Sequence, residues 1–301
     1  MSERIPFRVR PMLATLIAEP FDSPGWVYEE KYDGYRLLAY KEGSRVTLLS
    51  RNDKDKTAAF SPIAAAIAQL PSRTLLLDGE AVVFDRKRVS RFQLVQQGGE
   101  SMFAVFDCLY DDGRDLRKEP LSARRTAMEK AVDGAKVLFA SRRLAKNGLA
   151  AFQQAVKHGF EGIVAKEEAS PYVEGRSKKW VKVKIHQEDE FVIGGFSAPA
   201  GSRKHIGALL LGVYEDSKLS YVGKVGTGFS ASTLADLSRK FQPLIRAQSP
   251  FADPPRERDV TWLAPRLIAQ IAFQEWTADR KLRQPVFLGL RDDKEPLEVV
   301  R

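Results

Sequence analysis

A lysine close to an aspartate and a glycine is the first group in this chain with the potential for covalent chemistry: residues 30–36 read EKYDGYR. A lysine amine attacks a phosphorus atom only after losing its proton, and burial, neighbouring cations or a metal favour that loss. The spacing Lys-x-Asp-Gly fixes only three positions, and an exposed turn with Asp-Gly at its corner is an alternative explanation. Lys31 is therefore a candidate nucleophile whose assignment depends on a phosphate-binding site elsewhere in the chain.

Charged side chains that suit such a site follow in order along the chain: SRN at 50–52, LDGE at 77–80, FAVFD at 103–107, EGIVAK at 161–166 and KWVKVK at 179–184. In the last run, the period of two in a strand places Lys182 and Lys184 on one face and two valines on the other. Two cations on one strand face suit a buried triphosphate. An edge strand protected by lysines is the alternative.

The segment LRDDK at 290–294 is, by itself, most simply a charged turn. The chain has three histidines and one cysteine, Cys108, so a His-based triad or a Cys-rich zinc site is unsupported. Mg²⁺ prefers carboxylate and phosphate oxygens, which suits the glutamates of the segments above better. Cys108 lies in an apolar run and is expected to be a small core residue.

The elements that must position these residues divide the chain into two parts, in agreement with its 301 residues. Up to about residue 185, strand-like runs alternate with helix-like runs, including an expected helix that starts after Asn147 and ends at Gly159. Beyond that point, short strand candidates with one helix predict a small β-barrel. The acidic run QEDE at 187–190 is a plausible hinge between domains 1–185 and 186–301.

The charge balance is basic, with 48 Lys and Arg against 39 Asp and Glu and a net charge of +9. This balance suits a polyanionic partner, because Lys and Arg release condensed counterions when they meet phosphates. A merely soluble basic protein is the other interpretation of the charge alone. No stretch approaches the roughly 18 apolar residues of a membrane span, so we expect a cytoplasmic protein.

Taken together and in this order, the charged segments resemble the six motifs of the covalent nucleotidyltransferase superfamily, which includes DNA ligases, RNA ligases and mRNA capping enzymes. More closely, the chain is similar to the ligase domain of bacterial end-joining DNA ligases. Four further stretches carry this resemblance: PMLA at 11–14, WVYEEK at 26–31, YVGKVGTGF at 221–229 and FQEWT at 273–277. The resemblance implies an α+β, ATP-grasp-like nucleotidyltransferase (adenylation) domain followed by a small OB-fold β-barrel.

The resemblance also implies roles for individual residues. Lys31 would form the phosphoramide with AMP, and Glu30 and Asp33 would belong to the cofactor-binding segment around it. Arg36 and Glu80 would hold the ribose of ATP.

Three further sites follow from the same resemblance. Phe106 would stack on the adenine, although its place in an apolar strand equally suits core packing. Lys182 and Lys184 would bind the ATP phosphates. Arg51 would contact the 5′-phosphate of the broken strand, and Arg176 is a further candidate phosphate contact.

The metal and the second domain complete this set. Glu161, together with Glu80, would hold Mg²⁺, with Mn²⁺ as an alternative. Arg291 and Lys294 would position the pyrophosphate leaving group.

By this resemblance, the protein is an ATP-dependent DNA ligase that seals 5′-phosphate/3′-hydroxyl breaks through a lysyl-AMP intermediate, in DNA repair by end joining. Its partners would be duplex DNA with nicks or breaks and a Ku-like end-binding protein, and it would act as a monomer at the nucleoid. Two alternatives stay open. One is an RNA ligase or a GTP-using capping-type enzyme, and the other is a non-catalytic scaffold that binds DNA ends.

Overall fold

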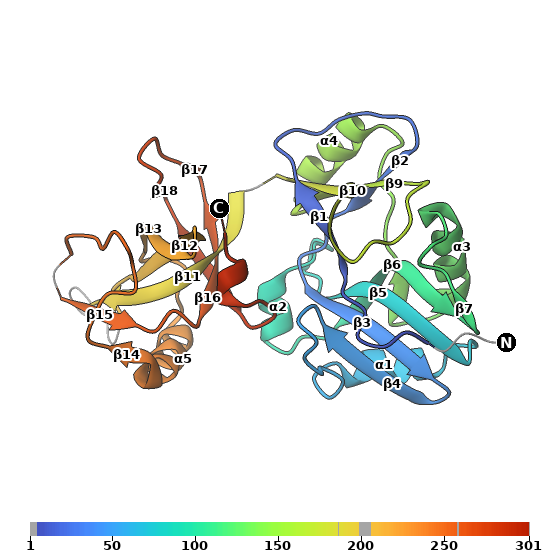
Figure 1. Cartoon of the computed structure of the whole chain (residues 1–301), viewed down its shortest axis with the longest axis horizontal. Helices are drawn as coiled ribbons and strands as arrows, with labels where there is room; N and C mark the ends of the chain where they lie inside the picture. Colours follow the sequence, from blue (N-terminus) through green and yellow to red (C-terminus); the bar gives the residue numbers. More distant parts are fainter. Residues whose placement is uncertain (1–4, 186, 199–205, 258, 301) are drawn as a thin grey trace. The chain divides into compact units, whose positions relative to one another are not determined.

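A computed structural model describes residues 5–185, 187–198, 206–257 and 259–300 of the chain. The chain divides into two compact units, Met1–Ile185 and His186–Arg301, which are described separately (Figure 1). None of the described helices is long and apolar enough to cross a membrane.

The described part of the first unit contains two sheets. In the larger one, the strand order is β4-β3-β5-β6-β7, and β8 pairs with β6 as well. Helices α1 and α3 cover its core, which includes the fully buried Leu37, Leu77 and Val105. The bounds are β3 Tyr35–Glu42, β4 Arg45–Ser50, α1 Ser61–Ala68, β5 Thr74–Val82, α2 Phe92–Gln96, β6 Met102–Asp111, β7 Arg114–Asp115, α3 Leu121–Val132 and β8 Leu138–Ala140.

The smaller sheet has the order β1-β10-β9-β2, and α4 packs on β2 and β9 (Figure 1). Strand β9 is antiparallel to both β2 and β10, whereas β1 and β10 are parallel. This sheet connects the segment before Lys31 with two others that are more than 100 positions later in the sequence. The bounds are β1 Met12–Leu16, β2 Trp26–Glu30, α4 Gly148–His158, β9 Gly162–Glu167 and β10 Gly175–Lys184.

Helix α4 begins and ends where the sequence predicts. The Asn147 side chain accepts a hydrogen bond from the Ala150 N–H, and Gly159 ends the helix with a φ of 72°, a conformation that glycine adopts without strain. The buried face of α4 is formed by small residues, among them Ala151 and Ala155. These small side chains allow the helix to pack closely on the sheet, so that the larger apolar residues of α4 lie partly in solvent.

The second unit is built on β11, an 11-residue strand. One edge of β11 pairs with β12, and the other is shared, first by β16 and then by β15. The pairings among the described residues do not close the sheet completely, and this arrangement is consistent with the small OB-fold β-barrel that the sequence predicts. The bounds are β11 Gln187–Ser197, β12 Leu209–Glu215, β13 Lys218–Val225, α5 Ala231–Phe241, β14 Ile245–Arg246, β15 Val260–Leu263, β16 Ile268–Phe273, β17 Glu275–Trp276, β18 Leu282–Arg283 and β19 Val286–Arg291.

The acidic run at 187–190 is strand rather than hinge, so that prediction is wrong. All four residues pair with β16, from Gln187 opposite Phe273 to Glu190 opposite Gln270. The run extends β11 because backbone pairing with β16 satisfies its N–H and C=O groups.

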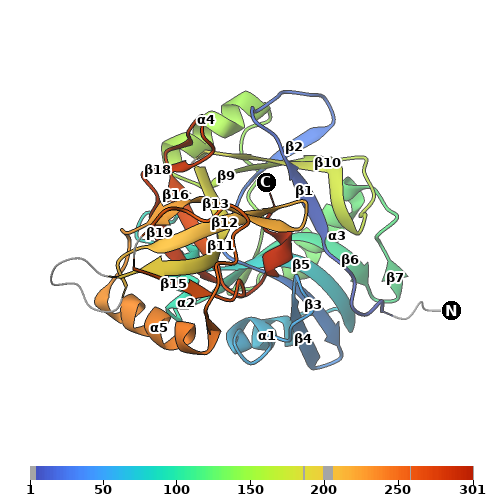
Figure 2. The ribbon, with the colours of Figure 1, turned by 60° about the vertical axis from the view of Figure 1, so that its left-hand side comes forward.

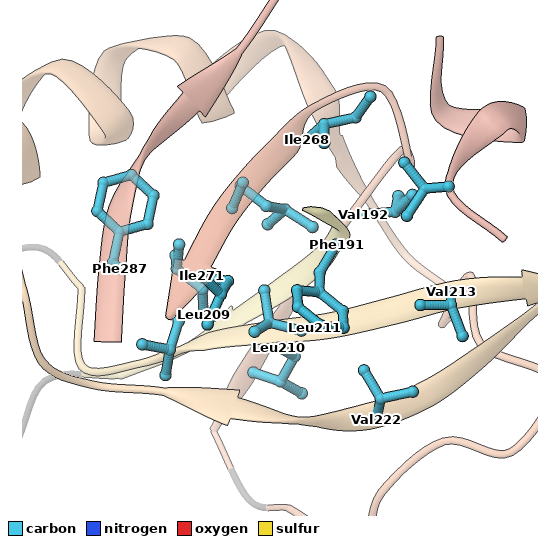
Figure 3. Packing of buried hydrophobic residues seen from close by; sticks show 14 of the residues in the cluster. Phe191, Val192, Leu209, Leu210, Leu211, Val213, Val222, Ile268, Ile271 and Phe287 are labelled. Atoms are coloured by element: carbon cyan, nitrogen blue, oxygen red, sulfur yellow. The ribbon is translucent and has the colours of Figure 1, made fainter. Parts of the chain in front are cut away.

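The core of the second unit explains why this sheet is stable despite its short strands. Leu209, Leu210 and Leu211 are consecutive in β12 and all fully buried, so both faces of the strand are covered (Figure 3). Strands β11, β12 and β13 lie side by side (Figure 2). Helix α5 packs against them through Phe241, whose ring stacks on Phe196 with centroids 5.4 Å apart.

Candidate active site

The candidate nucleophile Lys31 lies beside the carboxylate of Glu161. Lys31 directly follows β2, and Glu161 directly precedes β9, the antiparallel partner of β2. The Lys31 backbone N–H donates to the Gly162 carbonyl (3.1 Å), and Lys31 Nζ donates to Glu161 Oε2 (2.5 Å). Their side chains are 19% and 9% exposed, so a substrate can reach the amine while most solvent is excluded.

The two lysines of β10 contribute charge to the same place. Lys182 and Lys184 are half-buried, and the alternating Val181 and Val183 are buried, as the alternation predicts. Burial alone would raise the pKa of Glu161, but the positive charges of Lys31, Lys184 and Lys182 hold that pKa below its usual range. One carboxylate therefore faces three cations, an arrangement that suits an anionic substrate with several phosphates.

Arg36 and Glu80 occupy the adjoining sheet as direct register partners on β3 and β5. Arg36 makes a bidentate pair with Asp78, with both N···O distances at 2.6 Å, and donates to the Met12 carbonyl. Asp78 also accepts from the Tyr172 hydroxyl (2.7 Å). Arg36 is thus held in one orientation by a carboxylate that the sequence did not single out.

Phe106 is buried, with cations near its ring. The Arg36 guanidinium carbon lies 4.4 Å from the ring centroid and Lys166 Nζ lies 4.6 Å from it. Trp180 contacts it edge to face, with centroids 6.0 Å apart. The Arg36 guanidinium and the Lys166 ammonium therefore both lie against the Phe106 ring. An adenine stacked on the ring would have to share it with these side chains.

A buried ionic network behind the nucleophile was missed by the sequence analysis. The Glu29 carboxylate accepts from Arg125 (2.6 Å), Ser141 (2.7 Å) and Lys166 (2.8 Å). Glu29 and Lys166 are each 2% exposed. The sequence carried no clear signal, because each stands at the end of an apolar run and is followed by further charged residues, Glu30 and Glu167. Once buried, such charges are almost always paired. The network fixes β2 directly before Lys31.

Glu30 and Asp33 flank the nucleophile but point elsewhere in the fold. The Glu30 carboxylate is fully buried, and its closest charged neighbour is Arg142 at 3.5 Å. Asp33 is buried; its N–H donates to Ser90 Oγ (2.9 Å), and its carboxylate accepts from the N–H of Phe92 at the start of α2 (3.0 Å). Asp33 therefore anchors the loop after Lys31.

Gly34 in that loop leaves no room for a side chain. A Cβ there would lie 2.3 Å from the Ala81 carbonyl oxygen. The Lys-x-Asp-Gly spacing therefore has a structural reason at both its aspartate and its glycine.

The two remaining arginines of the first unit lie in different places. Arg51 follows β4, one position beyond Ser50, which pairs with Leu37, so it lies at the strand end alongside the Arg36 position. Arg176 lies near the start of β10, where it donates to the Ala14 carbonyl (3.0 Å). A bulge in β10 separates Arg176 from Lys182: they pair with Leu13 and Leu16, only three positions apart on β1, a distance of about 10 Å. Its hydrogen bond ties Arg176 to β1 and not to Lys31.

Arg291 and Lys294 belong to the second unit, and acidic residues of the same unit bind both. Arg291 pairs in bidentate fashion with Asp293 (2.8 and 2.7 Å). Lys294 Nζ lies 2.5 Å from Glu190 Oε1.

The carboxylates of the first unit fit a Mg²⁺ ion that shares its coordination with phosphates. No group of three or more His, Cys, Asp or Glu side chains in the described residues forms a cage for a metal. Mg²⁺ commonly uses only one or two carboxylates and takes the rest of its ligands from substrate phosphates and water. Glu161, beside three lysines that suit those phosphates, is a fitting donor.

The two units match the two family models of a known enzyme class. Residues 11–184 match the family described as ATP dependent DNA ligase domain, and residues 202–294 match ATP dependent DNA ligase C terminal region. DNA ligase C1 of Mycolicibacterium smegmatis is 31% identical over 323 residues, covering 96% of this chain and 91% of that relative. The chain belongs to the ATP-dependent DNA ligase family.

Within this family the chain is similar, over nearly its whole length, to the ligase domain of LigD-type end-joining ligases. The multifunctional non-homologous end joining protein LigD of Pseudomonas aeruginosa is 38% identical over 309 residues, covering 98% of this chain. The Mycobacterium tuberculosis LigD is 39% identical over 300 residues, covering 97%. The chain spans only 37% and 39% of the lengths of these relatives. A solved structure, mycobacterial DNA ligase D complexed with ATP and MES, is 37% identical with a TM-score of 0.74, covering 97% of this chain and 98% of that one.

Proposed function

We propose that this chain seals 5′-phosphate/3′-hydroxyl breaks in duplex DNA with ATP, through a lysyl-AMP intermediate on Lys31. The observation that carries the proposal is the convergence of Lys31, Glu161, Lys182 and Lys184 in a chain of the ATP-dependent DNA ligase family. A nucleophilic amine with a partly shielded carboxylate and two further cations is what nucleotidyl transfer from a triphosphate requires.

In the first step, Lys31 Nζ attacks the α-phosphorus of ATP. The N–P bond forms as the bond to pyrophosphate breaks, and Glu161, hydrogen-bonded to Lys31, is the nearest acceptor for the proton that the amine must lose. Lys182 and Lys184 stabilise the charge that develops on the pyrophosphate. When bound through Glu161, with Glu80 as a second proposed ligand, Mg²⁺ or Mn²⁺ would supply Lewis-acid stabilisation of the phosphates.

The nucleoside and the DNA would be held by the adjoining sheet. Arg36 and Glu80, neighbours on β3 and β5, are the proposed ribose contacts, and Phe106 the proposed adenine stack. In the second step, the DNA 5′-phosphate takes AMP from Lys31 with Arg51 as its proposed contact, and in the third a 3′-hydroxyl displaces AMP. Glu30, Asp33 and Arg176 lack direct support in the geometry as ligand contacts.

The biological setting is proposed from the relatives. The LigD proteins of Pseudomonas and Mycobacterium are named as non-homologous end-joining proteins. We place this chain in end-joining repair of broken duplexes at the nucleoid in the cytoplasm. There it would act as a monomer with a Ku-like end-binding partner. Its net charge of +9 suits DNA as the substrate.

A single experiment separates the proposal from its rivals: incubation with metal and α-labelled ATP or GTP, followed by denaturing electrophoresis and sealing of nicked DNA or RNA. We expect an acid-labile protein label from ATP, sealing of DNA, and loss of both in Lys31→Ala with the fold retained. Label from GTP, or sealing of RNA alone, would favour the capping or RNA-ligase alternative. Absence of label from either nucleotide would favour the non-catalytic scaffold.

A further inference from the structure

The pairing of the acidic run at 187–190 with β16 brings Glu190 beside charged residues near the C-terminus of the chain. Glu190 on β11 and Gln270 on β16 are direct register partners, so their side chains share one face of the sheet. Glu190 contacts Lys294 there (2.5 Å), and the Gln270 side-chain oxygen accepts from Arg291 Nη1 (3.3 Å). Two neighbouring strand positions thus hold the two cations proposed to act on the leaving group.

These cations differ in how firmly they are held. Arg291 is the last residue of β19 and forms a planar, bidentate pair with Asp293, both side chains being less than a tenth exposed. Lys294 lies beyond the strand, and its flexible four-carbon stem has no fork geometry to orient it. Lys294 forms an ion pair with Glu190, at side-chain exposures of 16% and 19%. Glu190 is therefore a group that holds the Lys294 ammonium in position.

From this geometry we infer that Glu190 is a positioning residue for nucleotidyl transfer, which acts by holding the Lys294 ammonium in place for its proposed role on the pyrophosphate leaving group. The inference rests on the proposed function, because it takes the role of Lys294 from there. Pyrophosphate leaves only in the first step. Loss of Glu190 must therefore slow the formation of lysyl-AMP and leave the sealing of DNA that already carries a 5′-AMP unchanged.

The variant Glu190→Gln keeps the shape of the side chain and removes its charge. We expect the single-turnover rate of lysyl-AMP formation to fall about tenfold, since displacement of a reacting or stabilising group by about 1 Å costs up to about a hundredfold. Sealing of a pre-adenylylated nick should stay within about twofold of wild type. The matched control is Asp236→Asn, a carboxylate on α5 of the same unit that pairs with Lys240 at 3.0 Å. It should change neither step.

A double-mutant cycle tests whether Glu190 acts through Lys294. If it does, Glu190→Gln combined with Lys294→Met forms lysyl-AMP no more slowly than Lys294→Met alone. The shorter Glu190→Asp keeps the charge and should recover part of the rate, which a loss of folding would not predict.

Other outcomes overturn the inference. A normal or faster first step in Glu190→Gln, equal slowing of both steps, or additive effects in the double variant would each refute it. If Lys294→Met slows lysyl-AMP formation and Glu190→Gln does not, only the inference fails. If Lys294→Met itself forms lysyl-AMP at the normal rate, the proposed role of Lys294 fails and the inference with it.

Discussion

Glu30, the residue directly before the proposed nucleophile Lys31, is expected to make the stability of the first unit depend on pH. Neither of its carboxylate oxygens has a hydrogen-bond partner among the described residues. Arg142, at 3.5 Å, is 47% exposed and so compensates little of the lost hydration. Burial consequently raises the pKa of Glu30 from 4.5 to about 7, against the smaller opposing effect of Arg142.

The sign and size of the effect follow from proton binding. Between pH 4.5 and about 7 the unfolded chain has released the Glu30 proton while the folded chain keeps it, so the free energy of unfolding falls as the pH rises through this window. The stabilisation that Glu30 contributes is fully present below pH 4.5, its pKa in the unfolded chain. It is lost as the pH rises through about 7, its pKa in the folded chain. Because one pKa unit is worth about 1.4 kcal/mol, the whole effect is about 3 kcal/mol.

The test is Glu30→Gln, which keeps the side-chain shape and removes the titration. Between pH 5 and pH 8, we expect the variant to gain about 2–3 kcal/mol of stability relative to wild type. Urea denaturation at four or five pH values, followed by tryptophan fluorescence, measures this difference. Glu42→Gln, at an exposed carboxylate paired with Arg45, controls for the loss of a surface charge. Parallel pH profiles for wild type and Glu30→Gln would refute the reasoning.

Two further substitutions test the packing around the site. Arg124→Met should destabilise the first unit by about 3–5 kcal/mol in urea denaturation, because it leaves the fully buried Asp107 without its bidentate partner. A loss below about 1 kcal/mol would show that other groups around Asp107 compensate for the missing arginine. Phe106→Ala should weaken ATP binding by about 1–3 kcal/mol in a titration if the ring stacks on adenine. Unchanged ATP affinity would assign Phe106 to core packing.

The local features of the site were predictable from the sequence because they depend on short-range geometry. The period of two in a strand predicted the shared face of Lys182 and Lys184, and the caps at Asn147 and Gly159 predicted the ends of α4. The Lys31–Glu161 pair joins residues 130 positions apart, and no local rule brings them together. The resemblance to ligases identified both residues, and the pairing of β2 with β9 explains their contact.

The features that the sequence did not reveal are those decided by tertiary packing. In the strand β2, Glu29 and Glu30 have the same chemistry, yet Glu29 has three hydrogen-bonded partners and Glu30 has none among the described residues. The acidic composition of 187–190 suggested a solvated hinge, but pairing with β16 made it a strand. In both cases the partners come from distant segments.

The convergence of Lys31, Glu161 and Lys184 is a consequence of strand direction. Lys31 follows the end of β2, Glu161 precedes the start of β9, and Lys184 ends β10. Because β9 is antiparallel to both neighbours, the end of β2, the start of β9 and the end of β10 lie at one edge of the sheet. A slip of one residue in the β9–β10 register would turn Lys182 and Lys184 to the opposite face and expose two buried valines. Burial of those valines therefore fixes the register, and the register fixes the cations beside Lys31.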